Sequence, residues 1–180
     1  IINFSSSLKV LGVKTKIANV FDAIKCGEYA NDISIYRDML KNDKEMANHY
    51  KKQLACFTVS GCFIDRRNTS NLENYNSIIH LDYDLKDEDK AKEIVALANE
   101  IPYTYCSFIS PSFGVKIFVR TDSNESNHNN CFNQLSDFYD EILQVISDRQ
   151  VKDITRLCFV SDDPNLFLNP DSANFLVDSK

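Results

Sequence analysis

Residues 77–84, Ser-Ile-Ile-His-Leu-Asp-Tyr-Asp, predict the strand around which the rest of the fold is organised. Successive side chains of a strand point to opposite faces of its sheet. One face of this segment is therefore apolar and consists of Ile79, Leu81 and Tyr83. The other face carries His80, Asp82 and Asp84. The segment thus predicts a strand with one buried side and one polar side, and the polar side holds two aspartates.

The residues that follow predict a helix and then a pair of strands. Acidic residues at 87–89 open the helix, where the helix dipole favours them, and its apolar stripe extends to Ala98. Residues 103–110 (YTYCSFIS) and 114–120 (GVKIFVR) predict the second and third strands. A Pro-Ser-Phe-Gly turn at 111–114 joins them.

A second helix and a fourth strand complete the pattern. The helix is indicated by apolar residues at helical spacing, namely Cys131, Leu135, Phe138, Ile142, Leu143 and Ile146. Residues 156–161 (RLCFVS) predict the strand. The order strand–helix–strand–strand–helix–strand is typical of a ferredoxin-like or RRM-like βαββαβ core. Such a core would make residues 77–84 and 114–120 antiparallel neighbours.

The N-terminal third predicts helices. Apolar residues recur at helical spacing within 15–55, and Gly27 separates two of the helical segments. Residues 58–68 (TVSGCFIDRRN) then predict a strand or turn that delivers Arg66 and Arg67.

The composition is that of one compact globular domain. Of the 180 residues, 43% are hydrophobic and 26% are charged. We expect an α+β fold in which an N-terminal helical segment, 1–66, packs on a core formed by 67–180, and we interpret the chain as a piece of a longer protein. Six cysteines form no C-x-x-C pair, which favours reduced thiols and a cytoplasmic protein. No apolar run is long enough for a membrane span, so no membrane partner is expected.

The charge argues against a protein that coats nucleic acid without specificity. The formal net charge is -6, whereas phosphate binding needs a basic surface. A local basic groove remains possible, and its candidate residues are Arg66, Arg67, Lys116, Arg120, Arg149, Lys152 and Arg156.

Asp82 and Asp84 are candidate metal ligands. Residues at i and i+2 of a strand lie about 6–7 Å apart at their Cα atoms, so both carboxylates can reach one divalent ion or bracket two. Mg²⁺ and Mn²⁺ prefer oxygen ligands and substrate phosphates, and phosphoryl transfer uses such ions. A D-x-D pattern alone fits a solvated sheet face equally well. We interpret His80, on the same face, as a histidine satisfied within the sheet.

Further groups could complete a site around these aspartates. Lys116 could contact a triphosphate, although by itself it fits an ordinary surface lysine. Ser110 and Ser112 could hydrogen-bond phosphate from the hairpin. Asp153 could complete the metal site and Arg156 could hold phosphate, although a local ion pair between these two would be common.

Together these motifs resemble those of the archaeo-eukaryotic primase superfamily. The matching features are D-x-D on a strand (82–84), a Ser/Gly hairpin that runs into a strand (SPSFGVKIFV, 110–119) and D-x-x-R before a final strand (153–156). The chain is most similar to the primase-like N-terminal domain of VirE-type proteins from Bacteroides mobile elements. There a similar helical lead precedes a Gly-Phe-basic segment, here GCFIDRR at 61–67. The resemblance covers about residues 15–169.

The resemblance implies a primase or primase-polymerase that joins nucleotides on a DNA template with Mg²⁺ or Mn²⁺. Asp82, Asp84 and Asp153 would be catalytic and would bind the metal. The nucleoside triphosphate would be held by Lys116, Ser110, Ser112 and Arg156, and Arg66 and Arg67 would meet the template or the phosphates. The resemblance also implies replication of a mobile element and a helicase-like domain in the same full-length chain.

One position departs from the family pattern, and it leaves alternatives open. Primases of this superfamily usually carry a His where this chain has Lys116. A lysine retains a cation but has no acceptor lone pair, so the change is expected to affect polymerising activity more than nucleotide binding. The alternative is a catalytically degenerate primase fold that binds nucleic acid or a partner helicase. A ferredoxin-like interaction domain without a ligand is the third possibility.

Overall fold

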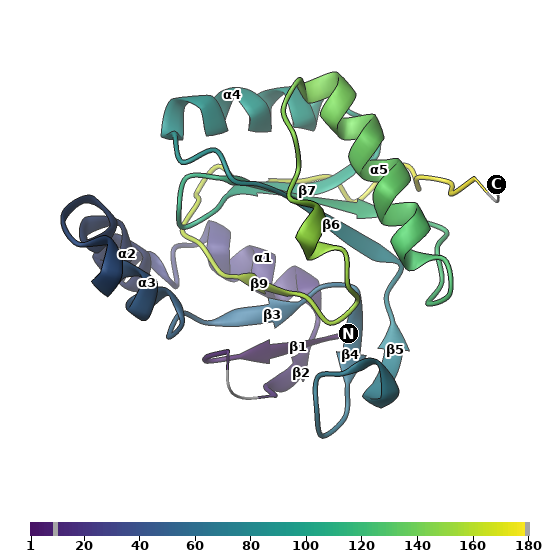
Figure 1. Ribbon diagram of the computed structural model, residues 1–180, viewed down its shortest axis with the longest axis horizontal. Helices are drawn as coiled ribbons and strands as arrows, with labels where there is room; N and C mark the ends of the chain where they lie inside the picture. Colours follow the sequence, from purple (N-terminus) through teal and green to yellow (C-terminus); the bar gives the residue numbers. More distant parts are fainter. Residues whose placement is uncertain (9–10, 179–180) are drawn as a thin grey trace.

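The computed structural model describes residues 1–8 and 11–178, which form a mixed α/β structure. This part of the chain contains five helices and three antiparallel sheets. The two larger sheets have four strands each. In Figure 1 they are stacked below helices α4 (Glu88–Asn99) and α5 (His128–Leu143). Within the described residues, no helix has the length and apolar character needed to cross a membrane.

The first sheet, called the β6 sheet, contains the strands that the sequence predicts most clearly. Its strand order is β10-β7-β8-β6. The bounds are Phe167–Leu168 for β10, Thr104–Ile109 for β7, Val115–Arg120 for β8 and Ile78–Tyr83 for β6. Strands β6 and β8 are antiparallel neighbours, which confirms the predicted pairing. Helix α4 links β6 to β7, and Asp87 caps it by accepting a hydrogen bond from the Lys90 amide at 2.9 Å.

The predicted fourth strand lies in the other sheet, so the ferredoxin-like core is not confirmed. This β3 sheet has the order β2-β1-β3-β9. The bounds are Val13–Thr15 for β2, Ile2–Ser5 for β1, Cys56–Thr58 for β3 and Leu157–Phe159 for β9. Strand β9 pairs with β3 and places Cys158 opposite Phe57. Both residues belong to an apolar cluster with Phe118 of β8, and burial against this cluster explains why β9 joins the β3 sheet.

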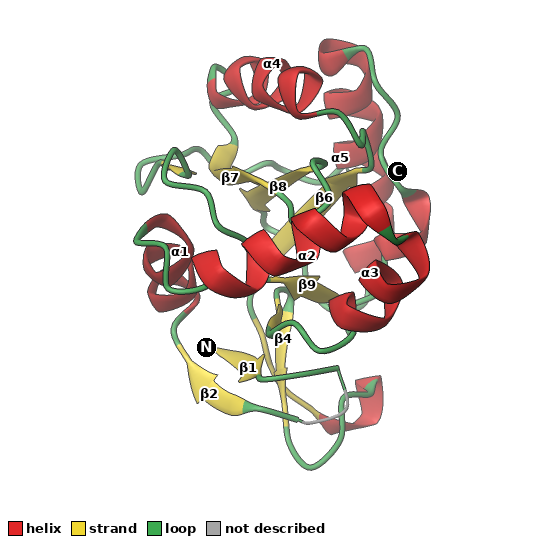
Figure 2. Ribbon diagram, turned by 90° about the vertical axis from the view of Figure 1, so that its left-hand side faces the viewer, coloured by secondary structure: helices red, strands yellow, loops and turns green. Residues whose placement is uncertain are grey.

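The N-terminal part contains the predicted helices together with strands. Helices α1 (Ile17–Lys25), α2 (Ala30–Asn42) and α3 (Lys44–Lys51) confirm the helical pattern, and α2 and α3 lie side by side at the front of Figure 2. A two-stranded sheet joins β4 (Gly61–Phe63) to β5 (Leu72–Tyr75). Residues 1–66 therefore hold four strands as well as three helices, and β3 shares its sheet with β9 from the second part of the chain.

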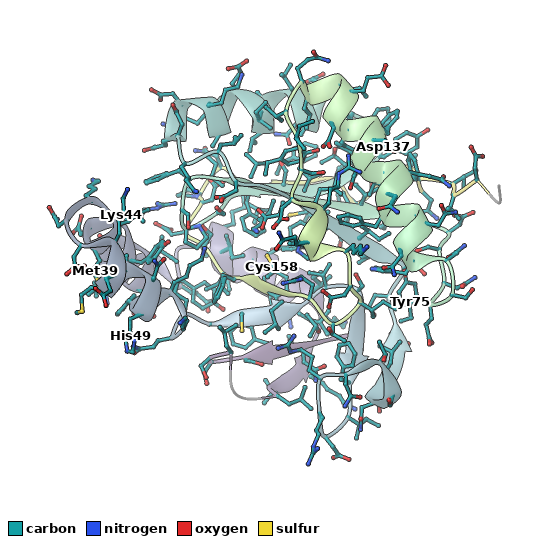
Figure 3. The ribbon with its side chains drawn as sticks, viewed as in Figure 1. Met39, Lys44, His49, Tyr75, Asp137 and Cys158 are labelled. Atoms are coloured by element: carbon teal, nitrogen blue, oxygen red, sulfur yellow. The ribbon has the colours of Figure 1, made fainter. Side chains whose placement is uncertain are left out.

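Two apolar cores lie on opposite faces of the β6 sheet. The apolar face of β6 packs with α4 and α5, as the alternation predicts, and it buries Ile79, Leu81 and Tyr83. The second core lies between the two four-stranded sheets and is closed by α1; its large members are Phe21, Phe57, Phe108 and Phe118. Cys158, near the centre of Figure 3, is also buried there, and all six cysteines are free thiols.

The apolar face of α5 differs in part from the predicted stripe. Cys131, Leu135 and Leu143 are buried, but Ile142 and Ile146 are 45% and 78% exposed. Helix α5 ends at Leu143 because Gln144 adopts the left-handed conformation, with φ at 54°. Ile146 therefore lies beyond the helix, and the predicted spacing no longer places it on the buried face.

Candidate functional site

A cavity of about 200 Å³ lies beside the end of β6 and the beginning of β8. We call it the β6–β8 cavity, and its lining residues are Lys51, Asp82, Asp84, Ser110, Pro111, Ser112, Lys116, Asp148 and Phe159. The structure thus brings together five of the predicted site residues from β6, β8 and the intervening hairpin. Pockets that enclose a whole small molecule measure about 300–1,000 Å³, so this cavity fits part of a larger ligand.

Asp82 and Lys116 form an ion pair at the base of this cavity. They are directly opposite each other in the β6–β8 register, and the Lys116 ammonium contacts the Asp82 carboxylate. Burial alone would raise the pKa of Asp82, but the charge and the hydrogen bond of Lys116, with smaller contributions from His80 and Lys51, together lower it. Burial likewise pulls the pKa of Lys116 down, but the charge and the hydrogen bond of Asp82, together with other nearby groups such as Asp84, raise it overall. Both residues are therefore charged, and each compensates the other.

Asp84 is the more accessible of the two β6-derived carboxylates. Its side chain is 60% exposed, and the Lys86 ammonium lies 3.4 Å from its Oδ2. An ion pair at this exposure is readily replaced by another cation because water screens it. Asp84 can therefore exchange its lysine partner for a ligand at the mouth of the cavity.

Asp148 lines the cavity next to Asp82, although the sequence argument does not single it out. Its backbone amide donates a hydrogen bond of 2.8 Å to the carbonyl oxygen of Asp82. Its side chain caps the following 3₁₀ turn by accepting a 2.8 Å hydrogen bond from the Gln150 amide. The segment around Asp148 is thereby fixed against the end of β6.

A buried network around Asp140 of α5 holds this segment in place. Asp140 is 7% exposed, and its carboxylate accepts hydrogen bonds from the Tyr83 hydroxyl at 2.9 Å and from the Ser147 amide at 3.0 Å. Arg149 donates to the same carboxylate at 2.6 Å. Because Tyr83 is in β6 and Ser147 and Arg149 flank Asp148, the network ties Asp148 to the strand that carries Asp82 and Asp84.

The β7–β8 hairpin contributes Ser110, Pro111 and Ser112 to the wall of the cavity. Ser110 and Gly114 close the turn, and the Gly114 amide donates a hydrogen bond of 2.9 Å to Ser110 Oγ. A Cβ on Gly114 would lie 2.4 Å from the Tyr83 carbonyl oxygen, so only glycine fits at this position. Phe113 adopts a φ of 60°, and the guanidinium of Arg37 stacks over its ring with 4.7 Å between Cζ and the ring centroid. The hairpin is therefore held in one conformation.

Lys51 reaches the cavity from α3, and no sequence pattern indicates it. Its ammonium donates to Ser112 Oγ at 3.2 Å and lies 5.6 Å from the centroid of the Phe159 ring. Tyr36 of α2 shares a 2.8 Å hydrogen bond with the same Ser112 hydroxyl. Burial, followed by the nearby charge of Lys116, lowers the pKa of Lys51.

The remaining predicted residues lie outside the β6–β8 cavity. Asp153 pairs with Arg156 at 3.0 Å, and both line a neighbouring cavity with Arg67. Arg66 and Arg67 line a further cavity beside β1. Phe159 lines both the β6–β8 cavity and the cavity that Asp153 and Arg156 line. The structure therefore does not bring Asp153, Arg156, Arg66 or Arg67 to Asp82 and Asp84.

His80 is a buried histidine of the sheet, in agreement with its interpretation from sequence. It is 3% exposed and stacks on Phe118, with 5.9 Å between ring centroids. Burial, reinforced by the charge of Lys116, lowers its pKa to about 3. The imidazole is therefore neutral at physiological pH and belongs to the core.

Three carboxylates line this site: Asp82 and Asp84 come from the end of β6, and the Asp148 carboxylate caps the following 3₁₀ turn. Within residues 1–8 and 11–178, no group of three or more His, Cys, Asp or Glu side chains is placed to hold a metal ion. Magnesium in phosphate-handling sites is commonly bound through one or two carboxylates, with substrate phosphates and water completing the shell. Asp82 and Asp84 fit that donor set, and Asp153 does not contribute to it.

The chain matches the model of one known protein family. A family model described as "BT4734-like, N-terminal domain" matches residues 49–168, which is more than half of the 180 residues. No curated protein and no solved structure matches the chain. The matched region includes every residue that lines the β6–β8 cavity. The chain belongs to the BT4734-like N-terminal domain family.

Proposed function

We propose that the β6–β8 cavity binds the phosphates of a nucleoside triphosphate together with Mg²⁺ or Mn²⁺. The observation that supports this proposal is the convergence of Asp82, Asp84 and Lys116 with the hairpin hydroxyls of Ser110 and Ser112 in one cavity. Carboxylates are suited to a divalent cation, hydroxyl groups are suited to phosphate oxygens, and Lys116 is the counterion of Asp82. The volume of the cavity fits the phosphates better than a whole nucleotide.

On this basis the domain acts as a primase-like nucleotidyltransferase on DNA, in the cytoplasm, within the replication protein of a mobile element. Strands β6, β7 and β8 with helices α4 and α5 follow the order expected for the core of such an enzyme, and β6 and β8 are neighbours. A helicase-like domain in the full-length chain is part of the same proposal.

The roles of the residues follow from their positions. Asp82 and Asp84 would hold the cation, which supplies activation of a hydroxyl nucleophile and neutralises the leaving pyrophosphate. Lys116 keeps Asp82 ionised inside the cavity. Ser110 and Ser112 orient phosphate oxygens along the hairpin wall, and the rigid turn at Gly114 keeps their spacing constant.

The Lys116–Asp82 pair also supports a second function, that of a binding module without catalysis. Lys116 already neutralises Asp82, so the site reaches charge balance at this carboxylate without a cation. Such a domain would bind nucleic acid or a partner helicase through a primase fold that no longer joins nucleotides. The two functions differ in catalysis and share the nucleotide-binding cavity.

One set of experiments separates the two functions. Thermal unfolding is followed with and without Mn²⁺ and a nucleoside triphosphate, because a ligand that binds the folded state raises the melting temperature. Strand synthesis on single-stranded DNA is then measured for the wild type and for Asp84→Asn. A stabilised protein that extends a strand, and loses this activity in Asp84→Asn, is the nucleotidyltransferase. A stabilised protein without synthesis is the binding module, and a protein that binds neither Mn²⁺ nor nucleotide overturns both.

A further inference from the structure

We propose that Lys51, and not Lys116, is the side chain that binds a phosphate group in the β6–β8 cavity, given that the cavity takes a phosphate-bearing ligand as proposed above. The structure provides two ammonium groups there, one from β8 and one from α3. Their surroundings differ, and this difference assigns them different roles.

Lys116 is already paired with a carboxylate. Its side chain is 12% exposed, and its ammonium contacts Asp82, which is directly opposite on β6. An anion that approached Lys116 would have to compete with this carboxylate and would meet its negative charge at close range. Lys116 is therefore the counterion of Asp82 and is poorly placed to take a phosphate.

Lys51 has a hydrogen-bonding partner but no counterion. Among the residues that the structure describes, its ammonium forms no ion pair with a carboxylate, and Ser112 Oγ is its hydrogen-bond acceptor at 3.2 Å. An ammonium has three donors, so donors remain for a ligand in the cavity that Lys51 lines. Burial of this cation lowers its pKa although Asp82 and Asp84 act on it from a distance, and a bound anion in direct contact would offset the cost of burial.

The contacts of Lys51 also direct it into the cavity. The Phe159 ring lies on one side of the ammonium, with 5.6 Å to the ring centroid, and Ser112 lies on the hairpin side. Ser112 is itself held by the Tyr36 hydroxyl at 2.8 Å. Helices α2 and α3 therefore position a cation in the cavity that Asp82 and Asp84 also line, where it would help to neutralise the charge of a bound phosphate.

Isothermal titration calorimetry with two probes tests this role. The first probe is inorganic tripolyphosphate without metal, and the second is a nucleoside triphosphate with Mn²⁺. Lys51→Met should weaken binding of tripolyphosphate about tenfold or more, because a charge-assisted hydrogen bond is lost. Lys51→Arg keeps the charge and should retain most of the affinity. Lys52→Met is the matched control, since Lys52 is exposed next to Lys51 and its loss removes the same charge.

The outcomes distinguish this inference from the proposed function. Wild-type binding of Mn²⁺ and nucleotide that Lys51→Met leaves at the level of Lys52→Met overturns the role of Lys51 and preserves the nucleotide site. Binding of tripolyphosphate that depends on Lys51, without any binding of Mn²⁺ and nucleotide, supports the anion site and overturns the proposed function. A wild type that binds neither probe overturns both. Thermal unfolding of each variant verifies that α3 is intact.

Discussion

Asp82 and Lys116 face each other across strands β6 and β8, and their side chains form an ion pair with exposures of only 21% and 12%. A mostly buried pair of this kind leaves an uncompensated charge when one partner is removed. The same two residues therefore link the stability of the β6 sheet to the electrostatics of the cavity.

Lys116→Met should destabilise the protein by about 3 kcal/mol, because Asp82 would remain charged in a poorly solvated position. The double variant Asp82→Asn with Lys116→Met should recover more than half of this loss. Urea denaturation of the single and double variants measures the coupling between the two residues. Lys86→Met is the control, since its pair with Asp84 is exposed, and it should change stability by less than about 0.5 kcal/mol. Equal effects of the two lysine substitutions would contradict the prediction.

Asp84→Asn should reduce cation affinity without reducing stability. The side chain is 60% exposed, so the change in unfolding free energy should stay within about 0.5 kcal/mol. Loss of one of two carboxylates should lower Mn²⁺ affinity about tenfold or more. Asp89→Asn, at a fully exposed carboxylate on α4, should leave the affinity unchanged. Electron paramagnetic resonance of free Mn²⁺ gives the binding constants, and equal constants for both variants would argue against Asp84 as a ligand.

Asp140→Asn should destabilise the protein and disturb the segment that carries Asp148. The carboxylate is buried and accepts hydrogen bonds from three residues, one of them the charged Arg149, so we expect a loss of about 2–3 kcal/mol. Asp137 provides the matched control on the same helix, since it contacts Arg149 from an exposed position on α5 (Figure 3). Asp137→Asn should cost less than about 1 kcal/mol. Chemical denaturation of both variants checks the difference, and hydrogen exchange at the amide of Asp148 should increase only in Asp140→Asn.

Gly114→Ala should destabilise the hairpin through a steric clash with the backbone. The added Cβ would lie 2.4 Å from the Tyr83 carbonyl oxygen and 3.2 Å from Ser110 Oγ, so β6 and the hairpin would have to move apart. We expect a loss of about 2–3 kcal/mol. Gly27→Ala is the comparison, because its Cβ would approach no atom closer than 3.6 Å and the cost there is backbone strain at φ 76°, about 1 kcal/mol. Thermal and chemical unfolding measure both losses, and a Gly114 variant as stable as the wild type would show that the turn can relax.

Stability should fall in acid because of His128. Burial lowers the pKa of this residue to about 4 from its ordinary 6.5, and the ring shares a 2.7 Å hydrogen bond with the Tyr75 hydroxyl. The unfolded chain therefore binds a proton first as the pH falls below about 6.5, and stability declines until about pH 4, by at most about 3 kcal/mol. His80, with a pKa of about 3, adds a contribution of the same sign. His128→Gln should flatten the curve of unfolding free energy against pH, and urea denaturation of the wild type and the variant between pH 4 and pH 7 measures the difference.

The sequence predicts those parts of the site that depend on the two-residue alternation of a strand or on a local turn. The two-residue alternation places Asp82 on the side of β6 away from Leu81 and places Lys116 on the side of β8 away from Ile117, and the β6–β8 register then sets the two residues side by side. The Ser110–Gly114 turn is likewise local, since its hydrogen bonds lie within five residues. These are the elements for which expectation and structure agree.

The parts that sequence does not predict depend on tertiary contacts. Asp148 and Asp153 lie in the same irregular stretch, and no repeating sequence pattern distinguishes one from the other. The hydrogen bonds of the Asp140 network, together with the one from the Asp148 amide to the Asp82 carbonyl oxygen, bring Asp148 to the cavity. Lys51 lies in a lysine-rich helix, and the sequence pattern of that helix does not distinguish it from the other lysines. Only its tertiary contacts with Ser112 and Phe159 identify it as the one at the cavity. The pairing of β9 with β3 follows from aromatic packing between the sheets, which a three-residue strand does not encode by itself.

The position of β3 between β1 and β9 determines which truncated fragments of this protein can stay folded and monomeric. A fragment limited to the family-matched residues 49–168 would lack β1, and β3 would present an unpaired backbone edge beside the apolar ring of Phe57. Bare edges of this kind recruit strands from other molecules, so the shortened fragment should aggregate. Soluble material for crystallisation or NMR therefore requires the residues upstream of the family boundary.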